Sequence, residues 1–208
     1  MKRTTIGKIA VFAACLVPAG LLGWRAWQQD LTANPIEYIT HFTGDWTLRF
    51  LLITLAITPL RRLTGQTWMI KYRRMIGLFA FFYGTLHLST YIVLDHFFNF
   101  HEMIADVYKR PYITAGVTAF TLMLPLALTS TKGWIRRLGG KNWQLLHRLV
   151  YFSAIAGVVH YWWLVKADLS KPQTYAAFLV VLLGYRLLAW SVNRRRSAVS
   201  RPAEVSAD

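Results

Sequence analysis

The sequence predicts an all-α fold, a polytopic bundle of six transmembrane helices with both chain ends in the cytoplasm. Three observations lead to this prediction. Apolar residues make up 55% of the 208 residues, which is too many for a disordered chain. They gather in blocks of about twenty residues, the length that a helix needs to cross a bilayer. Of the 24 basic residues, 16 lie at the termini and in alternate loops, against four in the other loops, as in an oriented membrane protein.

The predicted spans are the six apolar blocks between charged boundaries: 9–27, 46–63, 75–94, 111–128, 143–165 and 172–192. Each is expected to be helical, because in lipid only a helix satisfies its own backbone polar groups within one segment. The second block is the weakest, since Arg49 lies near its start and its uninterrupted apolar part is short. Pro18, Pro59 and Pro125 lie within or near the ends of spans, where neighbouring helices can absorb a kink.

The domain organisation and orientation follow from the same map. Residues 1–196 are predicted to form one transmembrane domain with its core at about 46–165. The polar segment 197–208 is predicted to be a disordered cytoplasmic tail. Sixteen Lys and Arg residues precede the first span or lie in the second loop, the fourth loop and the tail, when Arg61 and Arg62 at the end of the second span are counted with the second loop; only four lie in the odd-numbered loops. This asymmetry predicts a bacterial inner-membrane protein with both termini inside.

Composition also excludes several function classes. The formal charge of +15 does not indicate nucleic-acid binding, because the basic residues are confined to loops and no nucleic-acid-binding motif is present. A single cysteine, Cys15, excludes an internal disulfide and a thiolate-held iron–sulfur cluster. No Asp or Glu lies within the six blocks, which argues against a proton-coupled transporter and leaves no acid–base pair for hydrolysis.

Three of the six histidines lie inside predicted spans: His87 in the third, and His147 and His160 in the fifth. Ionisable side chains are costly inside a bilayer, so each is a candidate functional residue. Neutral imidazole can ligate haem iron, which suits a low-dielectric interior. The other interpretation, for any one of them, is a structural hydrogen bond to a neighbouring helix. The remaining histidines are expected to be solvated and are assigned no role: His41, His96 and His101.

Depth along the helices separates the three histidines into two groups. His87 lies about 20 Å beyond Arg74 at 1.5 Å per residue, and His160 lies 17 residues beyond Trp143. Both therefore fall in the outer half of the membrane and could clamp one haem between two helices. His147 lies about 20 Å nearer the cytoplasm, which disfavours a zinc site built from all three. On a straight helix His147 and His160 point about 140° apart, so tilt and twist would have to bring them to one face.

Arg73 and Arg74 could complete a second, inner site with His147, which has no histidine partner at its depth. Arg73 lies 14 residues before His87, directly before the start of the third predicted span. A guanidinium suits bidentate binding of a haem propionate or a flavin phosphate. The other interpretation, that both arginines only anchor the cytoplasmic end of the span, stays open.

Short stretches along most of the chain resemble a known family. They are HFTG (41–44), TPL (58–60), RR (73–74), TLHL (85–88), RPY (110–112), TST (129–131), WQLLH (143–147) and HY (160–161). In this order, with a third-span histidine and a fifth-span pair 13 residues apart, the chain resembles the ferric-reductase-like transmembrane domain. Within that group it resembles the MsrQ (YedZ) family of haem-binding membrane subunits of bacterial methionine sulfoxide reductase systems.

The resemblance implies a non-catalytic electron-transfer subunit. Such a protein passes electrons from the quinone pool or a cytosolic flavin reductase, through haem b and in this family also FMN, to a periplasmic molybdopterin methionine sulfoxide reductase (MsrP). That partner repairs oxidised periplasmic proteins. The family's haem-associated positions match His87, His147 and His160. Related oxidases carry a further third-helix histidine where this chain has Arg73, so the resemblance does not extend to a second bis-histidine haem.

Two other functions fit the residues. A stand-alone haem-containing metal or quinone reductase would use the same histidines without a periplasmic partner. A small transporter or membrane assembly factor would use the histidines structurally, and the purified protein would then be colourless.

Overall fold

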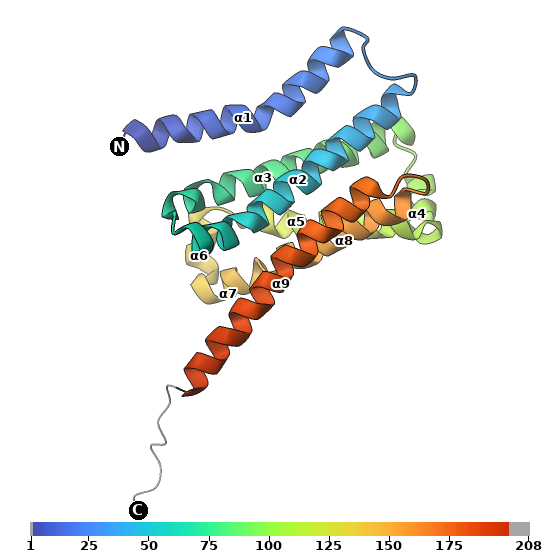
Figure 1. Cartoon of the computed structure of the whole chain (residues 1–208). Helices are drawn as coiled ribbons and strands as arrows, with labels where there is room; N and C mark the ends of the chain where they lie inside the picture. The colour runs from blue at the N-terminus through green and yellow to red at the C-terminus, as the bar shows by residue number, and fades with distance from the viewer. Residues whose placement is uncertain (1, 200–208) are drawn as a thin grey trace, which may run out of the picture.

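The computed structural model describes residues 2–199, with side chains for 5–195, and this part of the chain is helical without strands (Figure 1). The all-α prediction is therefore confirmed. The helices are α1 (Lys2–Trp27), α2 (Pro35–Thr64), α3 (Ile70–Thr90), α4 (Phe100–Lys109), α5 (Pro111–Leu128), α6 (Lys132–Leu138), α7 (Gly140–Leu146), α8 (Leu149–Leu164) and α9 (Ser170–Val199). A 3₁₀ turn (Thr67–Met69) precedes α3, and a π-helical turn (Tyr91–Asp95) follows it. Residues 200–208 of the predicted tail lie outside the described part.

Four segments within the described residues are long and apolar enough to cross a membrane: Thr5–Trp27, Thr67–Asp95, Pro111–Leu128 and Ser170–Arg195. They correspond to four of the six predicted spans, namely the first, third, fourth and sixth. The other two predicted spans fall on α2, which carries Asp45 and Arg49 in its first half, and on α8, which has only 16 residues. Six spans and the orientation of the chain therefore remain predictions.

The helices form a bundle with two distinct ends (Figure 1). The α2–α3 connection and helices α6 and α7 lie at one end, which we call the basic end. It is defined by the basic side chains at the end of α2, at the start of α3 and on α6 and α7: Arg61, Arg62, Lys71, Lys132, Arg136, Arg137 and Lys141. Helix α4 and the α8–α9 loop lie at the other, which we call the α4 end. Two pairs carry most of the packing, α2 along α3 and α5 along α8.

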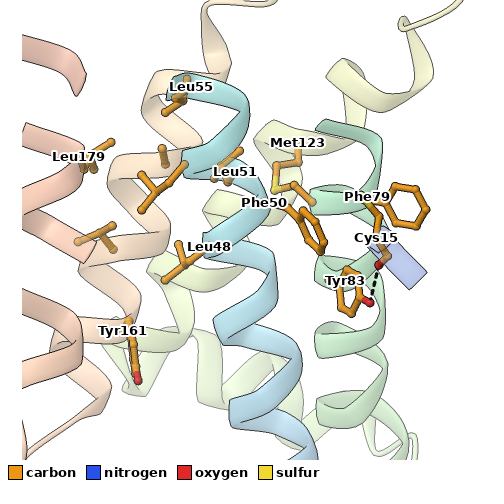
Figure 2. Packing of buried hydrophobic residues seen from close by; sticks show 14 residues of the cluster. Cys15, Leu48, Phe50, Leu51, Leu55, Phe79, Tyr83, Met123, Tyr161 and Leu179 are labelled. Carbon is orange, nitrogen blue, oxygen red and sulfur yellow. Dashed lines mark hydrogen bonds between the residues drawn. The ribbon is translucent and has the colours of Figure 1, made fainter. Parts of the chain in front are cut away.

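Helix α1 is attached to the bundle through Tyr83 of α3, which is fully buried. The Tyr83 hydroxyl donates to the Cys15 carbonyl at 2.9 Å and accepts the Ala19 N–H at 2.9 Å (Figure 2). These two groups would bond each other in a regular helix, so the hydroxyl is inserted into the backbone ladder of α1 next to Pro18. An inserted side chain beside a proline accounts for a bend, and α1 bends near its middle (Figure 1).

Helix α9 carries an arginine that the sequence analysis did not single out, although it lies inside the sixth predicted span. Arg186 donates to the Leu182 carbonyl of its own helix at 2.8 Å and to the Leu55 carbonyl of α2. Its guanidinium also lies over the Tyr151 ring of α8, 5.4 Å from the centroid. An intramembrane arginine calls for such partners, and these three contacts give Arg186 a structural role in joining α9 to α2 and α8.

The fifth predicted span, 143–165, is not one continuous helix. Helix α7 ends at Leu146 and α8 begins at Leu149, with His147 and Arg148 in the turn between them. The Trp143 carbonyl accepts both the His147 backbone N–H and His147 Nδ1, each at 3.0 Å. The imidazole thus bonds the same carbonyl as the backbone N–H of its own residue. Polar side chains commonly compete for backbone carbonyls in this way where a helix is interrupted. The predicted span 143–165 is therefore two helices, α7 and α8, joined by a turn at His147 and Arg148.

Candidate functional site

Two cavities lie within the bundle, and each contains histidines that the sequence predicted. The His87/His160 cavity has a volume of about 750 Å³ and is lined by residues of α2, α3, α4, α5 and α8. The His147 cavity has a volume of about 550 Å³ and lies between α2, α3, α5, α7 and α8. Both volumes fall within the range of about 300–1,000 Å³ typical of ligand and cofactor sites.

The ring of His87 is held against α2. Its Nδ1 lies 2.9 Å from the Thr40 carbonyl oxygen. A carbonyl only accepts, so Nδ1 carries the proton and Nε2 is the unprotonated nitrogen. One helical turn after Thr40, Gly44 makes room for the imidazole, because a Cβ at Gly44 would lie 3.2 Å from His87 Nδ1 and Cε1. Helix α2 thus fixes both the tautomer and the position of this ring.

The ring of His160 is held against α5 in the same way. Its Nδ1 lies 2.7 Å from the Tyr112 carbonyl oxygen, so Nε2 is again unprotonated. One turn after Tyr112, a Cβ at Gly116 would lie 2.8 Å from His160 Nδ1, closer than real Cβ contacts allow. Each histidine therefore sits on a carbonyl and a glycine four residues apart on the helix beside it, Thr40 and Gly44 or Tyr112 and Gly116.

The two imidazoles face the same space. Their ring centroids are 5.9 Å apart, which leaves room for one metal ion between two nitrogens that each bind it at about 2 Å. Within the described part of the chain, no group of three or more His, Cys, Asp and Glu side chains could hold a metal ion. Two axial nitrogens without further protein ligands suit a metal whose remaining positions are filled by a macrocycle, as in haem.

His147, Arg73 and Arg74 line the second cavity together. The His147 ring stacks on Trp143, with centroids 3.8 Å apart and planes 29° apart. Its Nδ1 donates to the Trp143 carbonyl, and its Nε2 is buried without a hydrogen bond of normal length and angle, although the Leu126 backbone lies close to the ring. A buried, unpartnered nitrogen costs free energy, so this atom is available to a ligand. Arg73 is half-buried and Arg74 exposed at the cavity.

Comparison with known proteins identifies the family of this chain. The family model described as ferric reductase-like transmembrane component matches residues 43–158. Curated relatives named protein-methionine-sulfoxide reductase heme-binding subunit MsrQ include those of Herminiimonas arsenicoxydans (51% identical, 95% of this chain and 92% of the relative) and Rhodospirillum rubrum (54% identical, 94% and 93%). A third, from Xanthomonas oryzae pv. oryzae, is 50% identical over 95% of this chain and 93% of its own. The chain belongs to the MsrQ family.

The family match covers His87 and His147 and ends at residue 158, just before His160. The longer alignments with MsrQ relatives extend over 92–97% of the chain. The predicted site residues thus fall into two groups in this MsrQ family member: His87 with His160 in one cavity, and His147 with Arg73 and Arg74 in the other. Their separation follows the division by depth that the sequence suggested.

Several residues of the first cavity were missed by the sequence analysis. His41 and His96 line it, although both had been assigned to outer loops; His41 lies within α2. His96 Nε2 lies 3.5 Å from Asp106, and its ring centroid lies 4.5 Å from that of Tyr91, whose hydroxyl is buried without a partner. The sequence did hold a signal for His41. Asn34 followed by Pro35, with Glu37 three residues after Asn34, is typical of a helix start, and α2 does begin there, well before the predicted span.

An apolar septum separates the two cavities of this MsrQ family member. Phe120 lines the first cavity and Phe81 the second, and their rings stack with centroids 5.4 Å apart. Met123 is buried and lines both cavities. The two candidate sites are therefore neighbours across one layer of side chains.

Proposed function

We propose that this chain is a membrane electron-transfer subunit that holds haem b between His87 and His160. The observation that carries the proposal is the pairing of these imidazoles at 5.9 Å, each with Nδ1 donating to a backbone carbonyl. Such second hydrogen bonds fix the tautomer of metal-ligating histidines and keep Nε2 directed at the metal. Haem b supplies one-electron redox chemistry at its iron when bound. Lys109 and Arg110, which line the same cavity, supply cations for its carboxylates.

A second redox site is proposed in the His147 cavity. His147 would offer Nε2 as a haem-iron ligand or as a hydrogen-bond acceptor for a flavin. Arg73 and Arg74 would bind the anionic group, a haem propionate or the FMN phosphate, since guanidinium forks bind such anions bidentately. The buried, unpartnered His147 Nε2 and the two arginines on one cavity support this site. FMN itself comes to the proposal from the family resemblance alone.

We propose that the chain connects an electron donor, the quinone pool or a cytosolic flavin reductase, with a periplasmic molybdopterin methionine sulfoxide reductase of the MsrP type. The names of the relatives, heme-binding subunits of a protein-methionine-sulfoxide reductase, support this role. A purified partner decides between this role and that of a stand-alone metal or quinone reductase. Rapid reoxidation of the dithionite-reduced chain by the partner plus methionine sulfoxide supports the subunit role, and no reoxidation favours the stand-alone reductase.

The proposed setting is the bacterial inner membrane, with six spans and both termini in the cytoplasm. Helix α2 has 30 residues, about 45 Å at 1.5 Å per residue, and packs along α3, while α8 packs along α5. Both α3 and α5 lie in segments apolar enough to cross a membrane. The packing of α2 and α8 along them therefore supports α2 and α8 as the second and fifth spans. A fluorescent-protein fusion at the C-terminus should fluoresce, and an alkaline phosphatase fusion after Lys109 should be active. The reverse pattern would contradict the orientation.

The deciding experiment is a dithionite-reduced minus oxidised absorption spectrum of the detergent-purified full chain. Sharp b-type bands are expected from the wild type and from His101→Ala, because His101 is exposed and lines neither cavity. His87→Ala and His160→Ala should each remove the low-spin bands of the haem they hold. A featureless wild-type spectrum from folded protein supplied with haem would refute the proposal, and unchanged bands in His87→Ala would refute the ligand pair.

A further inference from the structure

Helix α4 is strongly amphipathic, and its apolar face points away from the protein. Phe100, Ile104 and Tyr108 follow one another at four-residue steps, about 40° apart around the helix axis, with exposures of 60%, 60% and 86%. Asp106 lies on the opposite side and lines the His87/His160 cavity. A helix on a water-facing protein surface shows the reverse arrangement, with its polar face outward.

The turn before α4 adds two more exposed aromatic side chains. Phe97 and Phe98 are 78% and 57% exposed. Both adopt positive φ, 46° and 64°, a left-handed conformation that is rare for bulky residues. Asn99 then starts the helix, with its side-chain oxygen accepting the Glu102 N–H at 3.3 Å. Five large apolar or aromatic side chains in twelve consecutive residues are thus presented outward without a partner from the described part of the chain.

The position of α4 relates this face to the membrane. The helix follows one candidate membrane span, Thr67–Asp95, and ends directly before another, Pro111–Leu128. Both of its ends are therefore held where these helices leave the hydrocarbon. Asp106 is turned inward, where it contacts His96 at 3.5 Å and Arg110 at 3.4 Å. No ion pair that Asp106 makes has to be broken for the opposite face to enter lipid.

We propose that α4 lies in the plane of the membrane surface at the α4 end of the bundle, with its exposed face inserted into the lipid. Phe, Ile and Tyr on one side of a short helix fit the boundary between headgroups and acyl chains, where such helices insert by about 5–10 Å. The bilayer thereby holds α4, and with it Asp106, over the end of the His87/His160 cavity.

The proposal is independent of haem and can be tested with a label on α4. Cys15 is the only cysteine and is changed to Ala as the background. Ile104→Cys and Tyr108→Cys carry a nitroxide in phosphatidylcholine/phosphatidylglycerol nanodiscs, and Glu102→Cys, on the other side of the helix, is the matched control. Collisions with oxygen, which concentrates in lipid, are compared with collisions with a water-soluble nickel chelate.

The ratio of oxygen to nickel-chelate collisions should be several-fold higher at Ile104 and Tyr108 than at Glu102. Equal ratios at the three positions, with the labelled proteins monodisperse, would overturn the proposal. It would also be overturned if Ile104 became shielded from the nickel chelate only after soluble periplasmic proteins were added, because the face would then be a protein-docking surface. Two reporters on the apolar face keep the test decisive if one of them disturbs folding.

Discussion

Replacing Gly116 with alanine tests the arrangement that holds His160. The new Cβ would lie 2.8 Å from His160 Nδ1 and 3.0 Å from Cε1, so the ring or helix α5 must shift. The contact is with a ring whose Nδ1 is itself bonded to the Tyr112 carbonyl at 2.7 Å. Movement that relieves the clash therefore breaks this hydrogen bond and turns Nε2 away from the metal position.

The size of the effect can be worked out from that one hydrogen bond. Leaving a buried donor or acceptor unsatisfied costs about 1–3 kcal/mol. At about 1.4 kcal/mol per tenfold change, haem affinity should fall by between about fivefold and about a hundredfold. Gly44→Ala should have a smaller effect, because its Cβ would lie 3.2 Å from the His87 ring, a distance that a few tenths of an ångström of movement relieves.

Gly184 of α9 is the matched control, since a Cβ there would meet nothing within 4 Å. Alanine is favoured over glycine in a helix by about 1 kcal/mol, so Gly184→Ala should leave haem binding unchanged and stability equal or higher. Haem titration of the purified apoproteins, followed by the low-spin bands, measures the three affinities. An affinity for Gly116→Ala equal to that of Gly184→Ala would refute the reasoning that the glycine positions the ligand.

Three further changes test other parts of the structure. His147→Ala should retain the bands of the His87/His160 haem but lower the haem or flavin content per chain; unchanged content would remove His147 from a second site. Tyr83→Phe removes the two hydrogen bonds that join α1 to α3, each worth about 0.5–1.5 kcal/mol net, so its unfolding midpoint in detergent should fall while that of Tyr108→Phe, at an exposed site, does not. Arg186→Met loses hydrogen bonds from a charged group, each worth about 1.5–3 kcal/mol; a thermal midpoint equal to the wild type would show that these bonds do not hold α9.

Much of the fold could be predicted because the bilayer restricts what an apolar block can be. Blocks of about twenty apolar residues predict helices, and the described chain is helical. The polar ends of helices were harder to predict. Helix α2 begins at Pro35, eleven residues before the second predicted span, because hydropathy marks where a helix enters lipid and not where its capping residue starts it.

The candidate site could be predicted in its residues but not in its supports. A histidine among apolar residues stands out, so residue type and spacing alone were enough to select His87, His147 and His160 as candidates. The carbonyls of Thr40 and Tyr112 carry no such signal, because every residue has a carbonyl and only tertiary packing selects which one meets an imidazole. The same holds for Arg186. The sequence analysis looked only for acidic residues and histidines inside the spans, and the partners of Arg186 on α2 and α8 are defined only by the packing.

The interruption between α7 and α8 explains how two histidines of one segment can serve two different cavities. On a continuous helix they would point about 140° apart, and one of them would face away from the helices that form the cavities. At the turn formed by His147 and Arg148 the His147 ring stacks on Trp143, while His160 lies in α8. Trp143 in turn donates to the Thr129 carbonyl at 2.9 Å, which ties α7 to the end of α5. Since α5 also carries Tyr112 and Gly116 beside His160, this one helix fixes the positions of both histidines relative to each other.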